Sequence, residues 1–81
     1  MNLAFALMAQ FGKPVVRLEE ICDEYLGMSK AVATQHAKAG TLSIPVYRAT
    51  DSNKAPWLVN LSDLAQCFEQ KRDEAASDMV A

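Results

Sequence analysis

The sequence has few of the residues that build metal, redox or nucleotide sites. It holds one histidine, His36, and two cysteines, Cys22 and Cys67, which lie far apart in the chain. This set offers neither a histidine pair nor a closely spaced cysteine pair, so we expect no metal ion and two reduced thiols. The three glycines are too widely separated for a phosphate-binding loop. A chain of 81 residues also has little material for the walls of a deep pocket, and we expect no cofactor and no enzymatic activity.

Long apolar runs are missing as well. No segment has the roughly 20 consecutive apolar residues that a membrane-spanning helix needs. The first ten residues carry no basic charge, which a secretory signal peptide would have. The composition, 51% hydrophobic and 22% charged, is that of a folded soluble domain. We therefore expect a cytoplasmic protein with no membrane partner.

Acidic residues are nearly absent from the middle of the chain. The whole sequence has a formal net charge of −2, and the segments 1–27 and 61–81 are both net acidic. Between them, residues 28–60 contain one acid, Asp51, and four cations: Lys30, Lys38, Arg48 and Lys54. This asymmetry favours an anionic partner for the middle segment.

The first half of the chain contains two predicted helices. Residues 3–11 are uncharged and have apolar side chains at helical spacing, although the alternation of Leu3, Phe5 and Leu7 also fits a short strand. We favour a helix that ends before Pro14. Residues 18–26 have an apolar stripe with acidic residues on the opposite face, the strongest periodic pattern in the sequence.

Two further helices are predicted downstream. Residues 30–39 form an alanine-rich segment that Ser29 can cap at its N-terminus and Gly40 can end. The last helix begins near Leu61, and its pattern decays after Lys71 into a polar tail.

The remaining segments predict strands and define the expected fold. Val15 and Val16 can form a minor strand, and residues 44–48 and 57–59 predict a hairpin around a turn-rich segment. Two helices joined by a short turn and followed by a hairpin and a helix are typical of a small winged helix-turn-helix. We expect a mainly α fold with a small β-hairpin. A single winged helix-turn-helix domain covers residues 1–72, and residues 73–81 form a frayed tail.

This arrangement predicts contact with double-stranded DNA. A helix with small side chains can enter the major groove, where Gln35 can pair with an adenine, and the hairpin can reach the adjacent backbone. The predicted DNA-binding residues are Ser29, Lys30, Thr34, Gln35, Lys38, Arg48, Ser52, Asn53 and Lys54. The alternative for each single lysine is a solvated surface position, so the prediction rests on the group.

Other conspicuous residues have structural interpretations. Trp57 can anchor the hairpin on the helices or serve as a stacking platform. Cys22 lies on an apolar stripe and reads as a core residue, whereas His36 fits a helix surface or a partner contact. The acidic cluster of residues 19–24 has no apolar neighbours on its face, and we expect it to be solvated.

Nearly the whole chain resembles one family. The runs AFALMAQFGKPVVRLEEICDEYLGMS and AKAGTLSIPVYRATDSNKAPWLVNLSDLAQ are similar to the pyocin activator protein (PrtN) family, with LMAQFGKPV, AGTLSIPV and DSNKAPWLV as the distinctive parts. The resemblance implies a small DNA-binding transcription activator of a phage or phage-tail bacteriocin operon. The layout is also similar to that of Cox-type and excisionase proteins of temperate phages, which implies a DNA-architectural factor as an alternative.

Partners follow from these alternatives. Besides DNA, RNA polymerase is a candidate partner of an activator, and a DNA-free protein-interaction module, acting as inhibitor or adaptor, is a third possibility. Only three arginines are present, which favours several copies acting together on DNA. We expect a homo-oligomer built partly by the apolar residues 3–11. In the alternative, these residues pack on the closing helix of their own chain, near Leu64 and Phe68.

Overall fold

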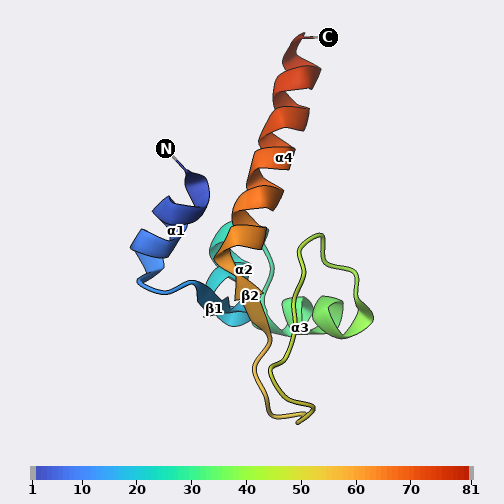
Figure 1. Ribbon diagram of the computed structural model, residues 1–81. Coiled ribbons are helices and arrows are strands. Elements are labelled where there is room, and N and C mark those ends of the chain that lie inside the picture. The colour runs from blue at the N-terminus through green and yellow to red at the C-terminus, as the bar shows by residue number, and fades with distance from the viewer. Residues whose placement is uncertain (1, 81) are drawn as a thin grey trace.

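The computed structural model describes residues 2–80, and these form four helices and two short strands (Figure 1). In chain order they are α1 (Leu3–Phe11), β1 (Val15–Arg17), α2 (Leu18–Leu26), α3 (Lys30–Ala39), β2 (Leu58–Asn60) and α4 (Leu61–Val80). The mainly helical class is confirmed, as are the four helices and the minor strand after Pro14.

The caps of α3 are those that the sequence predicts. The Ser29 side chain accepts a hydrogen bond from the backbone N–H of Val32, at 3.3 Å. Gly27 and Gly40, which end α2 and α3, have φ values of 66° and 69°. Residues with a side chain rarely adopt this left-handed conformation, so the two glycines set the short turn between the helices and the exit from the second one.

The small sheet differs from the predicted hairpin. β1 pairs with β2 in antiparallel register, with Val16 opposite Val59. On the other side of β2, a single bridge joins Tyr47 to Leu58. Residues 44–48 are therefore not a regular strand, and the prediction of a two-strand hairpin is wrong in this detail. Pro45 has no backbone N–H to donate, which limits pairing of this segment.

One continuous core joins all the helices and the sheet. Its buried side chains are Leu7, Val16, Leu18, Ile21, Cys22, Ala33, Ala37, Ile44, Val59, Leu61, Leu64 and Ala65. α1 packs against α4, and the Tyr25 ring lies between the rings of Phe11 and Phe68, at centroid distances of 6.3 and 5.6 Å. In α1, Leu7 is buried, and Leu3, Ala4, Met8 and Phe11 are half-buried against this core, which fits the alternative stated for this segment. Cys22 is a buried core residue, as expected.

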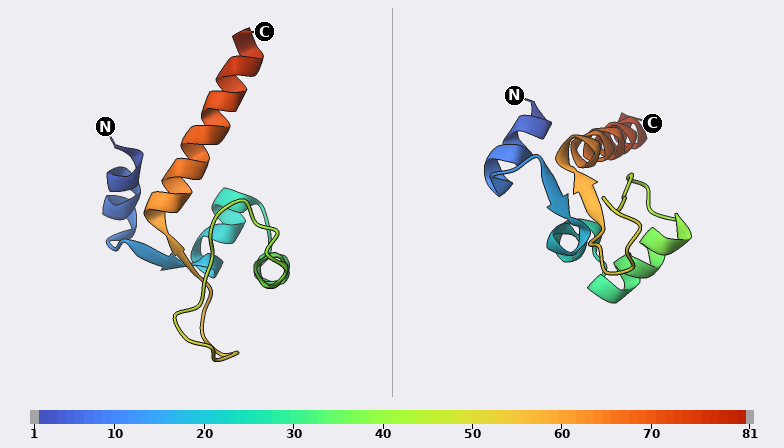
Figure 2. Two further views of the ribbon diagram at one scale, coloured as in Figure 1. Left: turned by 45° about the vertical axis from the view of Figure 1, so that its right-hand side comes forward. Right: turned by 60° about the horizontal axis from the view of Figure 1, so that its bottom comes forward.

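α4 is longer than the sequence pattern indicates. We expect a frayed tail after residue 72, but the helix continues to Val80. Residues 69–79 are all exposed, and this half of the helix projects beyond the rest of the molecule (Figures 1 and 2). The loop between the Tyr47 bridge and β2 projects at the opposite end. The principal extents of 46 × 27 × 18 Å reflect this elongated shape.

Candidate nucleic-acid interface

A hollow lies between α3, the start of α2 and the loop that precedes β2. Its volume is about 240 Å³. It is lined by Arg17, Leu18, Glu19, Lys30, Ala33, Thr34, Lys38, Arg48, Asn53, Ala55, Pro56 and Trp57. Three segments that are separate in the sequence therefore line one hollow. Figure 2 shows the arrangement of α2, α3 and this loop in two views.

The hollow has a surplus of positive charge. Four of its residues are cations, namely Arg17, Lys30, Lys38 and Arg48, and the only acid is Glu19. Glu19 is engaged with Arg17, at 3.6 Å between Oε1 and Nη1. The other three cations form no ion pair within residues 2–80. Charges of one sign gathered on a concave surface create a potential that attracts an anion.

The loop side of the hollow is held by a stacked pair. The guanidinium of Arg48 lies over the Trp57 ring, with Cζ 4.4 Å from the ring centroid, at the distance of a cation–π contact. The Arg48 Nε and the Trp57 Nε1 are both buried, and neither has a hydrogen-bond partner among the described residues. Trp57 packs against the core at the same time, so it anchors the loop on the helices, as one of the two predictions for it states.

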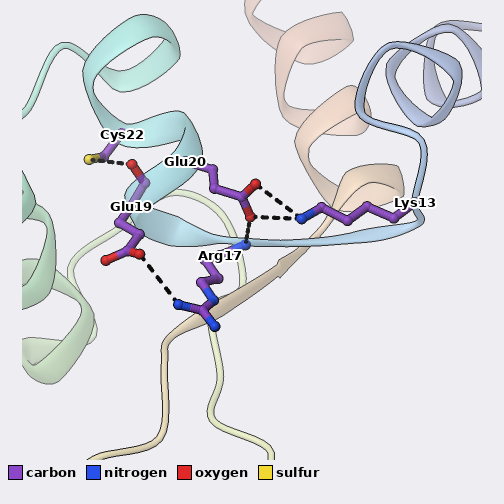
Figure 3. Close-up of polar contacts among 5 residues, drawn as sticks. All are labelled: Lys13, Arg17, Glu19, Glu20 and Cys22. Carbon is purple, nitrogen blue, oxygen red and sulfur yellow. Dashed lines mark hydrogen bonds and ion pairs between the residues drawn. The ribbon is translucent and has the colours of Figure 1, made fainter.

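The first turn of α2 is fixed by short polar contacts (Figure 3). The Glu20 carboxylate accepts hydrogen bonds from the backbone N–H of Arg17, at 2.7 Å, and from the Lys13 side chain, at 3.0 Å. The backbone bond, followed by the contact with Lys13, lowers the pKa of Glu20 below its usual value. The Leu18 N–H donates to the Trp57 carbonyl at 2.8 Å, which ties this turn to the loop. The acidic cluster is exposed as expected, but two of its members have defined partners.

The exposed surface of α3 has two parts. Lys30, Thr34 and Lys38 form the edge that lines the hollow. Ala33 and Ala37 face the core, and helical spacing places Gln35 on the opposite side, pointing away from the molecule. Val32, with 42% of its surface exposed, lies next to that outward face.

The predicted DNA-binding residues therefore fall into groups. Lys30, Thr34, Lys38, Arg48 and Asn53 come together around the hollow. The other four lie outside it. Among these, the Ser29 hydroxyl caps α3, and the Ser52 hydroxyl accepts the Lys54 N–H at 3.1 Å. Gln35 and Lys54 are exposed and make no side-chain hydrogen bond within residues 2–80.

Seven lining residues of the hollow are missing from the predicted set, and Arg17 and Trp57 are the two of them with side-chain N–H donors. Arg17 belongs to an acidic stretch of sequence, and counting charge along the chain assigned it to that stretch. The signal that could have found it is its position at the end of a strand, directly before a helix. The sequence predicts Trp57 as an anchor or a stacking platform, and the signal that it lies at the interface is that only nine positions separate it from Arg48 across the expected loop.

The single histidine lies outside the hollow, at the end of α3. His36 Nδ1 lies 2.6 Å from the Thr41 hydroxyl at the end of α3, outside the hollow. Within the described part of the chain, no three histidine, cysteine or acidic residues are placed to hold a metal ion. Nor does that part contain a helix long and apolar enough to cross a membrane.

These features define a small domain with a positively charged hollow beside α3. Comparison with known proteins identifies the family of the domain. The chain belongs to the pyocin activator protein PrtN family, whose model matches residues 4–75. The resemblance seen in the sequence is thus confirmed. The family implies transcriptional activation of pyocin genes, and its members are not enzymes. No curated protein and no solved structure matches the chain.

Proposed function

We propose that the protein activates transcription by binding double-stranded DNA as a winged helix-turn-helix in the cytoplasm. α3 is the recognition helix in the major groove, and the loop before β2 is the wing that follows the backbone. The observation that carries the proposal is the gathering of Lys30, Lys38 and Arg48, free of ion pairs within residues 2–80, beside the outward face of α3.

The topology supports this assignment. The order is helix, strand, two helices, loop and strand, with β2 paired to β1 on one side and bridged to Tyr47 on the other. A winged helix-turn-helix has its recognition helix directly before the segment that pairs with the last strand. The same order places the projecting loop next to α3, where both can meet one stretch of duplex.

The two-part surface of α3 supports a division of labour on DNA. Lys30 and Lys38 on the edge have the chemistry to contact phosphates, which position a protein without reading sequence. Gln35 on the outward face can make the bidentate contact that an amide forms with adenine, and the neighbouring Val32 can contact a thymine methyl group. The flanking alanines Ala31 and Ala39 leave the helix thin enough to approach the base edges.

The test is selection of DNA by the purified protein. Fragments of the genome that encodes it are incubated with the protein at low salt, and bound fragments are recovered and sequenced. We expect enrichment of one sequence motif and steep loss of binding between 50 and 200 mM salt, as counterion release requires. The absence of any duplex complex at low salt, together with capture of one protein partner, would favour the protein-interaction module. Strong bending of the selected DNA without activation of transcription would favour the excisionase-like role.

A homo-oligomer is part of the proposal, but its surface differs from the one expected. α1 packs against α4 through a buried Leu7 and several half-buried side chains, and its exposed large side chain is Phe5, at 70%. The exposed half of α4, residues 69–79, is a better candidate than α1 for the surface of self-association. An isolated helix as short as this half is marginally stable in water, and packing against a partner would stabilise it. In this half Arg72 lies three residues before Ala75 and Asp78 three residues after it, so two copies laid antiparallel across Ala75 place Arg72 of one copy level with Asp78 of the other.

Sedimentation equilibrium tests this assembly. We expect a dimer or larger species for the full chain, and weaker association after Arg72→Glu, which places like charges together. Arg72→Lys keeps the charge and serves as the control. A strict monomer over a wide concentration range would contradict the proposal of a homo-oligomer.

Activation also requires a contact with RNA polymerase. Asp23 and Glu24 on α2 are exposed and form no ion pair within residues 2–80, which makes them the proposed surface. We expect the double variant Asp23→Asn, Glu24→Gln to bind DNA normally and to lose activation in a purified transcription reaction. Unchanged activation would exclude this surface as the polymerase contact.

A further inference from the structure

Arg48 and Trp57, which both line the hollow beside α3, each carry a buried side-chain N–H without an acceptor among the described residues. We propose that the hollow seats one backbone phosphate of the DNA, and that Arg17, released from Glu19, closes over this phosphate. The proposal rests on the proposed function and deepens it, because it names the part of the DNA that the hollow takes and a residue outside the predicted set. It also gives Glu19 a role as the anion that occupies Arg17 while DNA is absent.

These unpaired donors are the first line of argument. Arg48 Nε and Trp57 Nε1 are buried without an acceptor among the described residues. Leaving a buried donor unpaired is unfavourable, so a shift of Arg48 that brings its Nε within reach of an acceptor in the hollow gains free energy. A phosphate offers charged oxygens on several sides, and a guanidinium matches its geometry with two parallel hydrogen bonds.

The size and charge of the hollow further restrict the class of ligand that it can bind. The hollow, about 240 Å³, is smaller than the roughly 300–1,000 Å³ of pockets that enclose whole small molecules. It therefore suits a single group that belongs to a larger partner. The net charge of its lining is +3, from four cations and Glu19, which selects an anionic group.

The position of the hollow matches a phosphate of the groove that α3 enters. Lys30 and Lys38 line it from the helix, while Arg48 and Asn53 line it from the loop. A phosphate bound here is held by both elements at once. Such a contact sets the angle of α3 in the groove without reading a base, as phosphate contacts do in general.

Arg17 is placed to complete this seat. Its backbone is fixed, because its N–H donates to Glu20 at 2.7 Å and the next N–H donates to the Trp57 carbonyl at 2.8 Å. Its side chain is 59% exposed and the Glu19 side chain 48%, so the ion pair between them is weak and open to exchange (Figure 3). A DNA phosphate competes with the Glu19 carboxylate for the same guanidinium.

Opposite effects of two neighbouring substitutions test this exchange. Fluorescence anisotropy measures binding of a labelled 20-base-pair duplex to the full-length protein as salt is varied. We expect Arg17→Ala to weaken binding about three- to tenfold and to reduce the salt slope by about 0.9, the value for one lost phosphate contact. Glu19→Gln should tighten binding several-fold, because it frees Arg17, and this gain should be clearly smaller when Arg17→Ala is already present, because only the repulsion between Glu19 and the phosphate is then removed.

Matched controls come from the exposed ion pair between Lys71 and Glu74 on α4. Lys71→Ala and Glu74→Gln each remove one member of that pair, and we expect duplex affinity per protomer to stay within about twofold at a fixed oligomeric state, because distant surface charges are screened. Arg17→Lys keeps the charge without the planar fork and should lie between Arg17→Ala and the unchanged protein. Circular dichroism verifies that each variant is folded.

The single tryptophan gives a second readout from within the hollow. We expect duplex DNA to change Trp57 emission as Arg48 shifts towards the phosphate, and inorganic phosphate alone to have little effect. Saturation by inorganic phosphate, with no response to duplex, would assign the hollow to a free anion and overturn the DNA assignment. If the protein binds duplex but Arg17→Ala leaves affinity and salt slope unchanged, the phosphate seat is wrong while the proposed function stands. Failure to bind any duplex overturns both.

Discussion

Helices α2 and α3 are neighbours of nine and ten residues, and each ends at a glycine in the left-handed conformation. They differ in what they bury. α2 buries Leu18, Ile21 and Cys22, whereas α3 buries only the methyl groups of Ala33 and Ala37. Their outer faces differ in the same way, since that of α2 is acidic and that of α3 carries cations and small residues.

This difference gives the two helices different roles: α2 anchors the fold through its buried side chains, and α3 presents its exposed face to a partner. Full burial of a leucine or isoleucine side chain stabilises a fold by about 1.5–3 kcal/mol, and an alanine methyl contributes much less. α2 is therefore held by packing, while α3 depends on its caps and on close approach to α2. A helix with small side chains towards the core and few large ones outside can be presented to a partner almost as a bare cylinder. The two helices together fit one anchor and one reader.

The largest effect on stability is expected for a substitution in the buried face of α2. Ile21 is fully buried at the centre of the core. We expect Ile21→Ala to lower the free energy of unfolding by about 3 kcal/mol, because it removes buried methylene groups and leaves a cavity. Urea denaturation followed by circular dichroism measures this loss. Val32→Ala in α3 is the control, and we expect a change below about 0.5 kcal/mol at this exposed position. A loss below 1 kcal/mol for Ile21→Ala would contradict the assignment of α2 as the anchor.

A second substitution tests the close approach of α3. Ala37 is 5% exposed, and its methyl group is part of the buried core. We expect Ala37→Leu to destabilise the protein by about 1–3 kcal/mol through overpacking. Ala39→Leu adds the same side chain at an exposed position of the same helix and should be nearly neutral. Equal stabilities of the two variants would show that α3 does not depend on small residues.

The sequence predicts the helices well because their signals are local. Ser29, Gly27 and Gly40 act on adjacent backbone, and the apolar stripe of α2 is visible in nine residues. The pairing of the strands is harder to predict, because the partner of β1 lies more than 40 positions away in the sequence. In addition, Pro45 has no backbone N–H to donate, so the segment before Tyr47 does not form a regular strand. The continuation of α4 to Val80 was missed because its side chains have no apolar pattern to reveal it.

The candidate interface was predictable only in part, for a spatial reason. Lys30, Thr34 and Lys38 share a helix edge that sequence spacing reveals, and their meeting with Arg48 follows from the expected order of elements. Arg17 joins them only because β1 runs beside β2 and the backbone next to it binds the Trp57 carbonyl. Charge counted by segment cannot show this, since the hollow draws its cations from two segments of opposite net charge.

The third prediction sharpens the role of α3 as reader. We expect Lys30→Ala and Lys38→Ala to weaken binding of all duplexes about equally and to reduce the salt slope by about 0.9 each. Gln35→Ala should instead change preference at one base pair by about 1–3 kcal/mol, with little change in salt slope. Competition anisotropy with a set of single-substitution duplexes separates the two patterns. Lys71→Ala on α4 is the matched control for loss of a lysine. An unchanged sequence preference for Gln35→Ala would show that this side chain does not read a base.

The smallest expected effect is a difference between α2 and α3 in how the stabilisation by their N-terminal caps depends on pH. The first turn of α2 is capped by Glu20, whose carboxylate accepts the Arg17 N–H, whereas α3 is capped by the uncharged Ser29. We expect Glu20→Gln and Ser29→Ala each to cost about 1 kcal/mol at pH 7, the usual value of a helix N-terminal hydrogen bond. The partial exposure of Glu20 keeps its contribution near the lower end of the range for charged groups.

The two losses should respond differently to acid. The folded state lowers the pKa of Glu20 from its ordinary value of 4.5, chiefly through the Arg17 backbone hydrogen bond. The stabilisation is therefore fully present above that ordinary value and is lost as the pH falls through the lower pKa of the folded state. In urea denaturation series from pH 7 to pH 3, the difference between the unchanged protein and Glu20→Gln should shrink below about pH 4.5. The difference for Ser29→Ala should stay constant, because a hydroxyl does not titrate in this range.

The control for loss of charge is Glu24→Gln. Glu24 is an exposed residue of α2 and forms no ion pair within residues 2–80. A Glu20→Gln difference that persists unchanged at pH 3 would mean that the charge of the carboxylate does not contribute to the cap.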